Sequence, residues 1–528
     1  MTVRVRYVTL HEEQPAIGFW DQEVLTRPTR WLGDDHAEGL DGVDAADPLM
    51  VVVPGRMNWE REPELASMLA RFERMVLVVT GDEEGRFDPV AAAPHARGWW
   101  FQMPHADPAP AEVLPLGAPP HAWGGLSRPH AERDLEWCFA GQVTHERRRQ
   151  LVAALLDVPH GLLLASDRFA MGVEPDAYAR LLGRARVVPC PGGPQHPETF
   201  RLYEAIEAGA VPLVERSTAD GRDWTWLWER LGIPAGLTVD SWGGVGTIIG
   251  SEPEGGWQRA ANRLQAMWAW RSYDLAAQVR VRLDVAAPEV TSIVTMSPIP
   301  SHPSLEVLEE TLRSIRDNGP SGPVIVCCDG PRPDDDVGAY EEAVRRLCDR
   351  CLHDPAWANV LPLIAEDWQH QANMIRLALD RVESPVVLVV EHDTPLVDAP
   401  VPWAGLVAAV RSGEANVVRL HHEASILPDH RHLMVGDGPV DMCGAPLWRT
   451  IQWSQRPSLA SAAYYRRLLA DHFPVSCRGF VEDHVYSVVE QARWEDHRVA
   501  IYHPAGDIKR STHLDGRAGA EKAPAYVS

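Results

Sequence analysis

The chain has 528 residues, which is too many for one hydrophobic core, so about two to four domains are expected. Hydrophobic residues make up 45% of the chain and charged residues 23%, as in a globular protein. The 50 basic and 74 acidic residues give a formal net charge of −24 at pH 7. This charge argues against a nucleic acid or an anionic membrane surface as partner, because both need a basic binding surface. A single nucleotide still fits, because a few arginines, a helix N-terminus or a metal ion can neutralise its phosphates.

No apolar stretch has the roughly 20 residues that cross a bilayer, and Met1–Leu10 has the pattern of a strand and not of a signal peptide. The eight cysteines do not form the framework of a small disulfide-rich domain. Cys348 and Cys351 are a CxxC pair, but no second pair follows at zinc spacing, so we interpret them as free thiols on a helix. Together these features predict a cytoplasmic protein.

The first half alternates short apolar runs with amphipathic segments, as parallel sheets built from βαβ units do. The expected strands are Val3–Leu10, Leu49–Val53, Met75–Thr80, Trp99–Gln102, Trp137–Ala140, Gly161–Ala165, Arg186–Pro189 and Ala210–Val214. The Pro- and Gly-rich stretch Pro115–Pro129 divides this pattern, so we predict two Rossmann-like halves, residues 1–127 and 128–287. A long amphipathic helix around Trp257–Leu283 closes the second half.

The second half of the chain begins a new α/β domain at residue 288, which we expect to extend to residue 517 before a polar tail at 518–528. The expected strands are Val290–Met296, Pro323–Cys328, Val386–Val390 and Val417–Leu420, and the expected helices are Leu305–Asp317, His370–Arg381 and Pro457–Ala470. One strand runs directly into Glu391-His392-Asp393. Two acids at the carboxyl end of a buried strand can hold a divalent cation, which can in turn bind a diphosphate. They could equally be solvated side chains at a strand end.

Two further acidic features accompany this one. Asp329 ends an expected strand, and Glu482-Asp483 follow Glu391-x-Asp393 later in the chain. This order resembles the GT-A glycosyltransferases of the family-2-like, inverting kind, although Glu391 stands where that family has Asp. The resemblance implies that Asp329 contacts the nucleobase, that Glu391 contacts the donor ribose and that Asp393 binds the metal. It also implies that Asp483, with Glu482 beside it, is the catalytic base.

The proposed chemistry explains why these groups are needed. A sugar hydroxyl is a weak nucleophile, so a carboxylate must take its proton as it attacks the anomeric carbon. A divalent cation neutralises the charge on the diphosphate leaving group. The alternative interpretation of the late acid pair is a helix start that favours negative charge. The resemblance further implies a late histidine as metal ligand, for which His503 and His513 are candidates, and basic residues for the diphosphate, Lys509 and Arg510. Either histidine could instead be structural.

The first half carries its own motif. Thr199-x-Arg201-x-x-Glu204-Ala-x-x-x-Gly209-x-x-Pro212 matches a run of the exostosin family of GT-B glycosyltransferases, with Thr in place of Ser, and the chain resembles the C-terminal half of that family. The resemblance implies a nucleotide-sugar site at Arg201 and Glu204. A strand that ends in Gly141 before a helix can offer backbone N–H groups to a diphosphate, and Arg147 can approach it. Alternatively, Glu204 is a solvated helix residue. His105, Glu112 and Asp134 are equally good candidates for the base of this module.

The two resemblances together imply a bifunctional glycosyltransferase of the α/β class. A GT-B module would combine an acceptor half at 1–127 with a nucleotide-sugar half at 128–287, and a GT-A module would occupy 288–517. The expected donors are nucleotide-diphosphate sugars, UDP-sugars first among them, and the acceptor is a glycan or a small molecule. The GT-A module would use Mn²⁺ or Mg²⁺, and the GT-B module no cofactor. The alternatives are one catalytic module beside an acceptor-binding scaffold, a sugar nucleotidyltransferase, or a non-catalytic glycan-binding protein.

Overall fold

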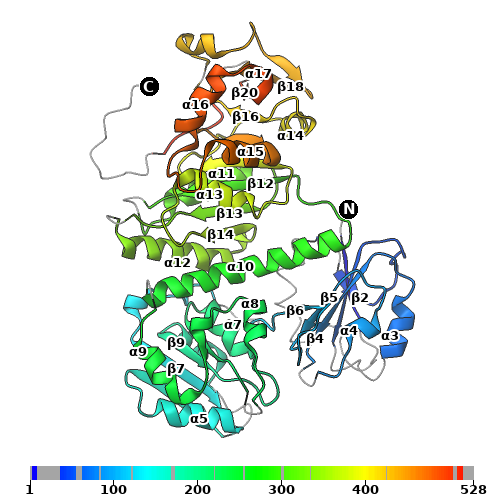
Figure 1. Ribbon diagram of the computed structural model, residues 1–528, viewed down its shortest axis with the longest axis vertical. Helices are drawn as coiled ribbons and strands as arrows, with labels where there is room; N and C mark the ends of the chain where they lie inside the picture. The colour runs from blue at the N-terminus through cyan, green and yellow to red at the C-terminus, as the bar shows by residue number, and fades with distance from the viewer. Residues whose placement is uncertain are drawn as a thin grey trace. The chain divides into compact units, whose positions relative to one another are not determined.

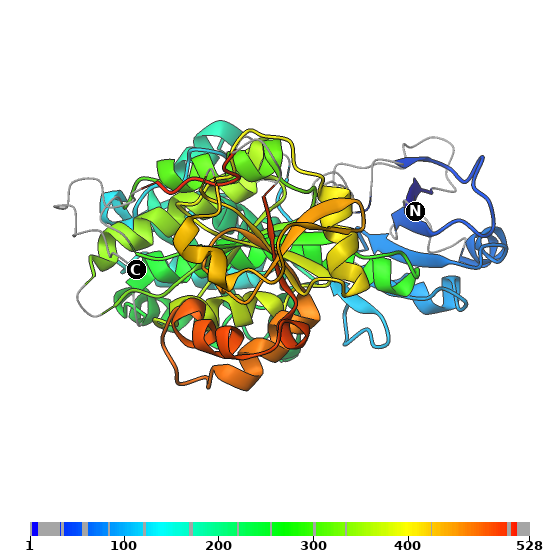
Figure 2. The same cartoon turned by 90° about the horizontal axis from the view of Figure 1, so that it is seen from above.

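The computed structural model describes residues 3–8, 32, 36–54, 62–82, 85–119, 123–167, 173–218, 221–253, 256–298, 302–332, 335–423, 425–503 and 508–514. The chain forms two compact units (Figures 1 and 2). Unit 1 comprises Met1–Ala286 with Cys348–Asp354, and unit 2 comprises Ala287–Leu347 with Pro355–Ser528. No helix in the described ranges is both long and apolar enough to cross a membrane.

Unit 1 contains a six-stranded parallel sheet in the order β2-β1-β3-β4-β5-β6. Its strands are β1 (Arg4–Tyr7), β2 (His36–Glu38), β3 (Leu49–Pro54), β4 (Met75–Thr80), β5 (Trp99–Gln102) and β6 (Glu112–Leu114), with the helices α3 (Glu62–Leu69) and α4 (Pro89–Ala92) between them. The apolar strand β4 is buried along its whole length. This is expected of parallel strands that are covered on both faces.

A second parallel sheet of unit 1 has the order β11-β10-β9-β7-β8. Its strands are β7 (Leu135–Gln142), β8 (Gly161–Ser166), β9 (Ala185–Cys190), β10 (Val211–Glu215) and β11 (Thr238–Val239), and its helices are α5 (Glu146–Leu155), α6 (Pro175–Leu182), α7 (Phe200–Glu207), α8 (Thr225–Leu231) and α9 (Val245–Gly250). Because β7 pairs with both β8 and β9, the strand order reverses there. Ligands of open α/β sheets bind outside the carboxyl ends of the strands at such a switch point.

The long helix α10 (Gly256–Arg282) packs on both sheets of unit 1 (Figure 1). Trp257 and Leu264 belong to the hydrophobic core of the second sheet, whereas Leu275 and Val279 belong to a core of the first. The prediction of parallel, Rossmann-like sheets in the first half of the chain is therefore confirmed. Cys348 and Cys351, in the part of α12 (Val337–His353) that belongs to unit 1, are buried free thiols as predicted.

Unit 2 contains a nine-stranded mixed sheet in the order β14-β13-β12-β15-β19-β16-β20-β18-β17. Its strands are β12 (Val290–Met296), β13 (Val324–Cys328), β14 (Val360–Ile364), β15 (Val386–Glu391), β16 (Val417–Leu420), β17 (Val440–Met442), β18 (Ala445–Thr450), β19 (Ser458–Ser461) and β20 (Val499–Tyr502). β19 runs antiparallel to both β15 and β16, and β20 runs parallel to β16. Consequently one edge of the sheet, which we call the carboxyl edge, is where β13, β15, β16 and β20 end. The antiparallel strand β19 begins at the same edge.

The helices of unit 2 are α11 (Glu306–Asn318), most of α12, α13 (His370–Leu379), α14 (Trp403–Ser412), α15 (Ala462–His472), α16 (Val481–Gln491) and α17 (Trp494–His497). The prediction of one helix over Pro457–Ala470 is wrong at its start. Residues 458–461 form β19, because they insert between β15 and β16, and the helix begins afterwards. Ser461 caps it by accepting the Tyr464 N–H.

A close backbone approach fixes the loop after β13. A Cβ at Gly330 would lie 2.6 Å from the backbone nitrogen of Trp368 and would collide with the carbonyl of Asp367. Beside it, Asp329 accepts the backbone N–H groups of Gln369 at 2.7 Å and of His370 at 3.0 Å. His370 has φ +62°, in the left-handed region that non-glycine residues rarely adopt. Asp329 therefore holds the start of α13 in an unfavourable backbone conformation.

The close approach at Gly330 makes a direct prediction about stability. Gly330→Ala should lower the free energy of unfolding of unit 2 by about 1–3 kcal/mol, because the added methyl group has only backbone to displace. Gly338→Ala is the control, since its Cβ would have only an ordinary contact with the Asp336 side chain. Denaturant unfolding of both variants tests this, and equal stabilities would contradict it.

Candidate active site

The C-terminal segment 510–514 pairs with the chain that leaves β15. The Leu514 N–H donates to the Asp393 carbonyl at 2.7 Å, and the Val397 N–H donates to the Arg510 carbonyl at 3.1 Å. This antiparallel pairing brings His513 Nε2 to 3.4 Å from Asp393 Oδ2. Of the two histidines that the sequence suggested as metal ligands, His513 is therefore the one that lies beside Asp393.

The pair at Asp393 and His513 is partly open to solvent, with side chains 18% and 53% exposed. Burial acts to raise the pKa of Asp393, but the hydrogen bond and charge of His513 outweigh it, so this pKa lies below its ordinary value. The same bond raises the pKa of His513. Carboxylate oxygen and imidazole nitrogen are both ligands of Mn²⁺-type cations. Over the described ranges, no group of three or more His, Cys, Asp or Glu side chains converges on one point, so a cation here would take its other ligands from substrate or water.

Glu391 is held beside this pair by a residue that the sequence did not single out. Gln371, in the first turn of α13, donates its Nε2 to Glu391 Oε1 at 2.9 Å, and its Oε1 accepts the Val481 N–H at 3.2 Å. Burial and the negative charge of Asp393 raise the pKa of Glu391 to about 7. Gln371 thus ties Glu391 to the N-terminus of α16. A glutamine beside a helix start gives no signal of this kind in a sequence.

The predicted acid pair lies in the first turn of α16. Glu482 accepts the backbone N–H of Gln455 at 2.9 Å, which anchors α16 to the loop before β19. Asp483 is exposed. Together with Gln371, this arrangement brings Glu391 and the acid pair to the carboxyl edge.

The remaining predicted residues of unit 2 lie elsewhere on the carboxyl edge. His503 follows β20, and its ring centroid is 4.9 Å from that of His421, which follows β16. The Arg510 N–H donates to the His421 carbonyl at 2.7 Å. Lys509 is exposed. Along the strand pair, Arg510 is separated from His513 by about 10 Å at roughly 3.3 Å per residue. The register of the strand pair thus places Arg510 further from Asp393 than His513, and His503 lies beside His421.

Asp329 also lies at this edge, but its two oxygens are engaged with the start of α13 and it is 2% exposed. Burial raises its pKa, against the opposing effect of those backbone hydrogen bonds. Nearby, the Arg332 guanidinium lies over the Trp368 ring at 5.2 Å. The stacked guanidinium of Arg332 and indole of Trp368 therefore form a flat surface beside Asp329. Such a surface is suited to a planar ligand.

In unit 1, three of the four predicted residues meet at the switch point. Arg201 donates its Nη2 to the Ala140 carbonyl at 2.9 Å and lies over the Phe139 ring at 4.8 Å. A Cβ at Gly141 would collide with that guanidinium, so glycine is needed for the approach. One turn along α7, Glu204 accepts a hydrogen bond from the Tyr178 hydroxyl at 3.1 Å. Burial raises the pKa of Glu204, and the charge of Arg201 opposes this.

The fourth residue, Arg147, is engaged in a buried ion pair. Its Nη1 lies 3.3 Å from Glu215 Oε2, with both side chains 7% exposed, and its Nη2 donates to the Gly193 carbonyl. Glu215 in turn accepts the Gly192 N–H at 3.0 Å and the Trp242 indole N–H at 2.7 Å. Arg147 thus fixes the glycine loop after β9. Its guanidinium is not presented to solvent.

The three candidate bases of unit 1 have different surroundings. Asp134 is in an exposed ion pair with Arg184, and Glu112 is in one with Arg230. His105 instead follows β5, and its ring centroid is 5.8 Å from that of His196, in the loop after β9. His105 is therefore in contact with the loop that follows β9.

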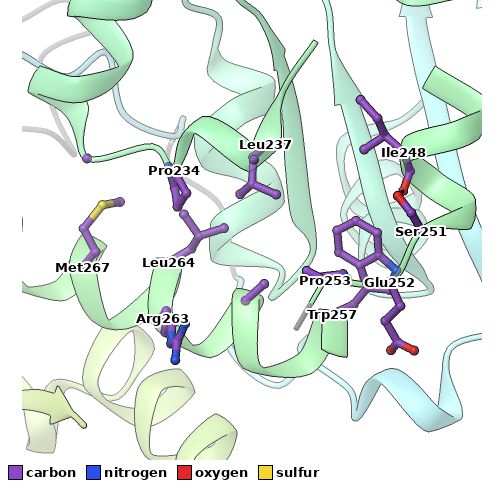
Figure 3. Close-up of a pocket in the computed structure, with 13 residues that line it drawn as sticks. Pro234, Leu237, Ile248, Ser251, Glu252, Pro253, Trp257, Arg263, Leu264 and Met267 are labelled. Atoms are coloured by element: carbon purple, nitrogen blue, oxygen red, sulfur yellow. Dashed lines mark hydrogen bonds between the residues drawn. The ribbon is translucent and has the colours of Figure 1, made fainter. Parts of the chain in front are cut away.

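A half-open cavity of about 610 Å³ lies elsewhere in unit 1 (Figure 3). Trp257, Leu264 and Met267 of α10 line it together with Pro234 and Leu237. These last two residues precede β11, so the cavity adjoins the amino edge of the sheet. It is therefore separate from the switch point, which lies at the carboxyl ends of the strands.

Comparisons with known proteins find no matching family model and no matching curated protein. Among solved structures, the chain is similar to residues 1–349 of S. aureus TarS, at 14% identity and a TM-score of 0.29, over 43% of this chain and 60% of that one. It is also similar to GalNAc-T7 solved with UDP, GalNAc and Mn²⁺, at 12% identity and a TM-score of 0.31, over 44% and 46%. The chain thus spans less than two thirds of the length of these structures.

A buried acid beside the switch point gives a prediction for pH dependence. Glu198 is 1% exposed and accepts the Leu116 N–H at 2.7 Å and the Tyr203 hydroxyl. Burial raises its pKa to about 7. The folded protein therefore keeps a proton that the unfolded chain releases at its lower pKa. Stability should be greatest at acid pH and should fall by up to about 3 kcal/mol as pH rises to about 7.

Glu198→Gln should remove this pH dependence and stabilise unit 1 above pH 7, because the amide cannot ionise. The free energy of unfolding at acid and alkaline pH, for the wild type and the variant, measures the effect. Glu229→Gln, at an exposed position of α8, is the matched control and should leave the pH profile unchanged. A wild-type profile that is flat across this range would contradict the assignment.

Proposed function

We propose that unit 2 is an inverting GT-A glycosyltransferase, which transfers a sugar from a nucleotide diphosphate to a hydroxyl group of a glycan or small molecule. The observation that carries this proposal is the pairing of Asp393 with His513 at the edge where Glu391 and the acid pair of α16 also lie. The chain order of these acids, which resembles the GT-A enzymes, supports the same conclusion.

Asp393 and His513 would hold a Mn²⁺ or Mg²⁺ ion, whose charge would stabilise the diphosphate leaving group. Glu391 would contact the donor ribose, and its bond from Gln371 fixes its direction. Asp329 would position the loop at the start of α13 beside the nucleobase. Its oxygens already accept the backbone N–H groups of Gln369 and His370, so it would contribute mainly by holding that loop.

Asp483 is the proposed base. As the acceptor hydroxyl attacks the anomeric carbon, its proton passes to the Asp483 carboxylate, and the bond from that carbon to the diphosphate breaks. Asp483 is exposed, whereas Glu482 is anchored to Gln455. A carboxylate within hydrogen-bond reach of the acceptor hydroxyl is suited to this proton transfer.

Unit 1 would be a second, GT-B transferase without a metal, which makes the chain bifunctional. Gly141, Arg201 and Glu204 at the switch point support this assignment. Arg201 would meet the donor phosphates and Glu204 the ribose hydroxyls, while Arg147 holds the glycine loop from beneath. If unit 1 turns no donor over, it serves as an acceptor-binding scaffold for unit 2.

Asp393→Ala should lower the metal-dependent turnover of unit 2 by at least about a hundredfold, because the cation loses its anionic ligand. Nucleotide release from a set of nucleotide sugars, with Mn²⁺ and with EDTA, measures this. Asp398→Ala, an exposed residue on the same segment, should retain wild-type turnover. Undiminished metal-dependent turnover in Asp393→Ala would refute the metal site.

Asp483→Asn should lower transfer by about 10²–10⁴-fold while donor affinity stays within about twofold, because the amide cannot take the proton. Transfer rates and calorimetric donor binding separate these two effects. Glu490→Gln, on the same helix, is the control. A collapse of donor affinity in Asp483→Asn would show that this residue is not simply the base.

A further inference from the structure

The carboxyl edge of unit 2 has a second half that the donor chemistry does not use. Beyond β19, this edge carries a group of arginine and histidine side chains. They form a cationic cluster that consists of Arg419, His421, His422 and Arg510, and the two guanidinium groups carry its charge because burial lowers the pKa of His421 to about 4 and that of His422 to about 3. Arg419 lies on β16, the two histidines follow that strand, and Arg510 follows β20.

The members of the cluster are in contact. The ring centroids of His421 and His422 are 5.7 Å apart, and the Arg510 N–H bonds the His421 carbonyl at 2.7 Å. Arg419, His421 and Arg510 are only 3%, 5% and 4% exposed. His422 is more open and lies 3.4 Å from Glu423. The cluster therefore places two guanidinium groups and an imidazole largely out of water.

In the ranges that the structure describes, neither Arg419 nor Arg510 forms an ion pair with a carboxylate. Arg419 Nη1 donates to the Gln452 carbonyl at 3.0 Å, but its Nε has no acceptor. Arg510 lies over the Tyr502 ring at 5.5 Å, and neither Arg510 Nε nor Arg510 Nη1 has a hydrogen-bond acceptor. A desolvated guanidinium without a counter-ion is costly, so the cluster has unused capacity to bind an anion.

The position of the cluster indicates which ligand would bring that anion. Burial lowers the pKa of Arg419 to about 10, and the negative charge of Glu482 opposes this shift, so the cluster adjoins the acid pair of α16. Asp393 lies on the other side, two strands away at the end of β15. A donor diphosphate at Asp393 would thus leave the cluster open to the second substrate.

We propose that the cationic cluster is an acceptor subsite that binds an oxyanion, a phosphate or carboxylate group carried by the acceptor. The anion site stands on the contacts of the cluster, and its assignment to the acceptor rests on the proposed function. The guanidinium of Arg510 supplies the central hydrogen bonds, since a planar fork of N–H donors fits an oxyanion. Unit 2 would then select negatively charged acceptors over neutral ones.

The test uses the full chain and inorganic phosphate as probe. The melting temperature of unit 2 is followed during titration with phosphate, against chloride at equal ionic strength, with UDP and Mn²⁺ present to occupy the donor site. Wild-type protein should be stabilised by phosphate. Arg510→Met should bind phosphate at least about tenfold more weakly, and in chloride it should melt no lower than wild type, because it removes an uncompensated buried charge.

Arg449→Met is the matched control, because Arg449 lies on β18 and, like Arg510, its guanidinium lies over an aromatic ring, that of Trp494 at 5.3 Å. Its response to phosphate should equal that of wild type. The inference is overturned if phosphate does not stabilise wild type, if Arg510→Met keeps the full response, or if UDP abolishes the response. A separate titration with UDP and Mn²⁺ alone reports on the donor site, so its failure would count against the proposed function and not against the anion site.

A second arm separates the two sources of oxyanion. Glucuronate, glucose 6-phosphate and glucose are compared in the same titration. A carboxylate acceptor predicts that glucuronate stabilises wild type more than the phosphate ester does, and a phosphate acceptor predicts the reverse. Equal effects from charged sugars and neutral glucose would refute selection by charge.

Discussion

The pairing of segment 510–514 with the chain after β15 is the constraint on which the site of unit 2 depends. Without it, Asp393 would be a solvated acid at a strand end. With it, backbone hydrogen bonds at Asp393 and Val397 fix the register, and the register brings His513 against the carboxylate. Two side chains about 120 residues apart along the chain are brought together because backbone hydrogen bonds join the segments that carry them.

In both units, a glycine allows a close contact beside the candidate site residues. In unit 2, Gly330 lets the next loop approach, so that Asp329 can hold the start of α13 and Gln371 can reach Glu391. In unit 1, Gly141 leaves the space that the Arg201 guanidinium fills. These are contacts at which a single methyl group would be felt, because packed interiors have little free volume.

The sequence predicted what depends on local pattern and missed what depends on distant contacts. Continuous apolar runs identified the buried strands, and the acids of Glu391-x-Asp393 followed from one of them. Strand β19 resembles a helix start and becomes a strand only because β15 and β16 flank it. The choice between His503 and His513 depends on a pairing between segments far apart in the chain. Arg147 was predicted to meet phosphate, but Glu215, more than 60 residues later, holds it in a buried ion pair.

The most direct test of the central claim is the pulsed electron paramagnetic resonance of Mn²⁺ bound to the full chain with UDP. If Asp393 and His513 hold the cation, the spectrum should show coupling to one imidazole nitrogen, and His513→Gln should abolish this coupling while His503→Gln leaves it intact. Coupling that survives in His513→Gln, or that disappears only in His503→Gln, would contradict the assignment of the metal site and with it the proposed function of unit 2.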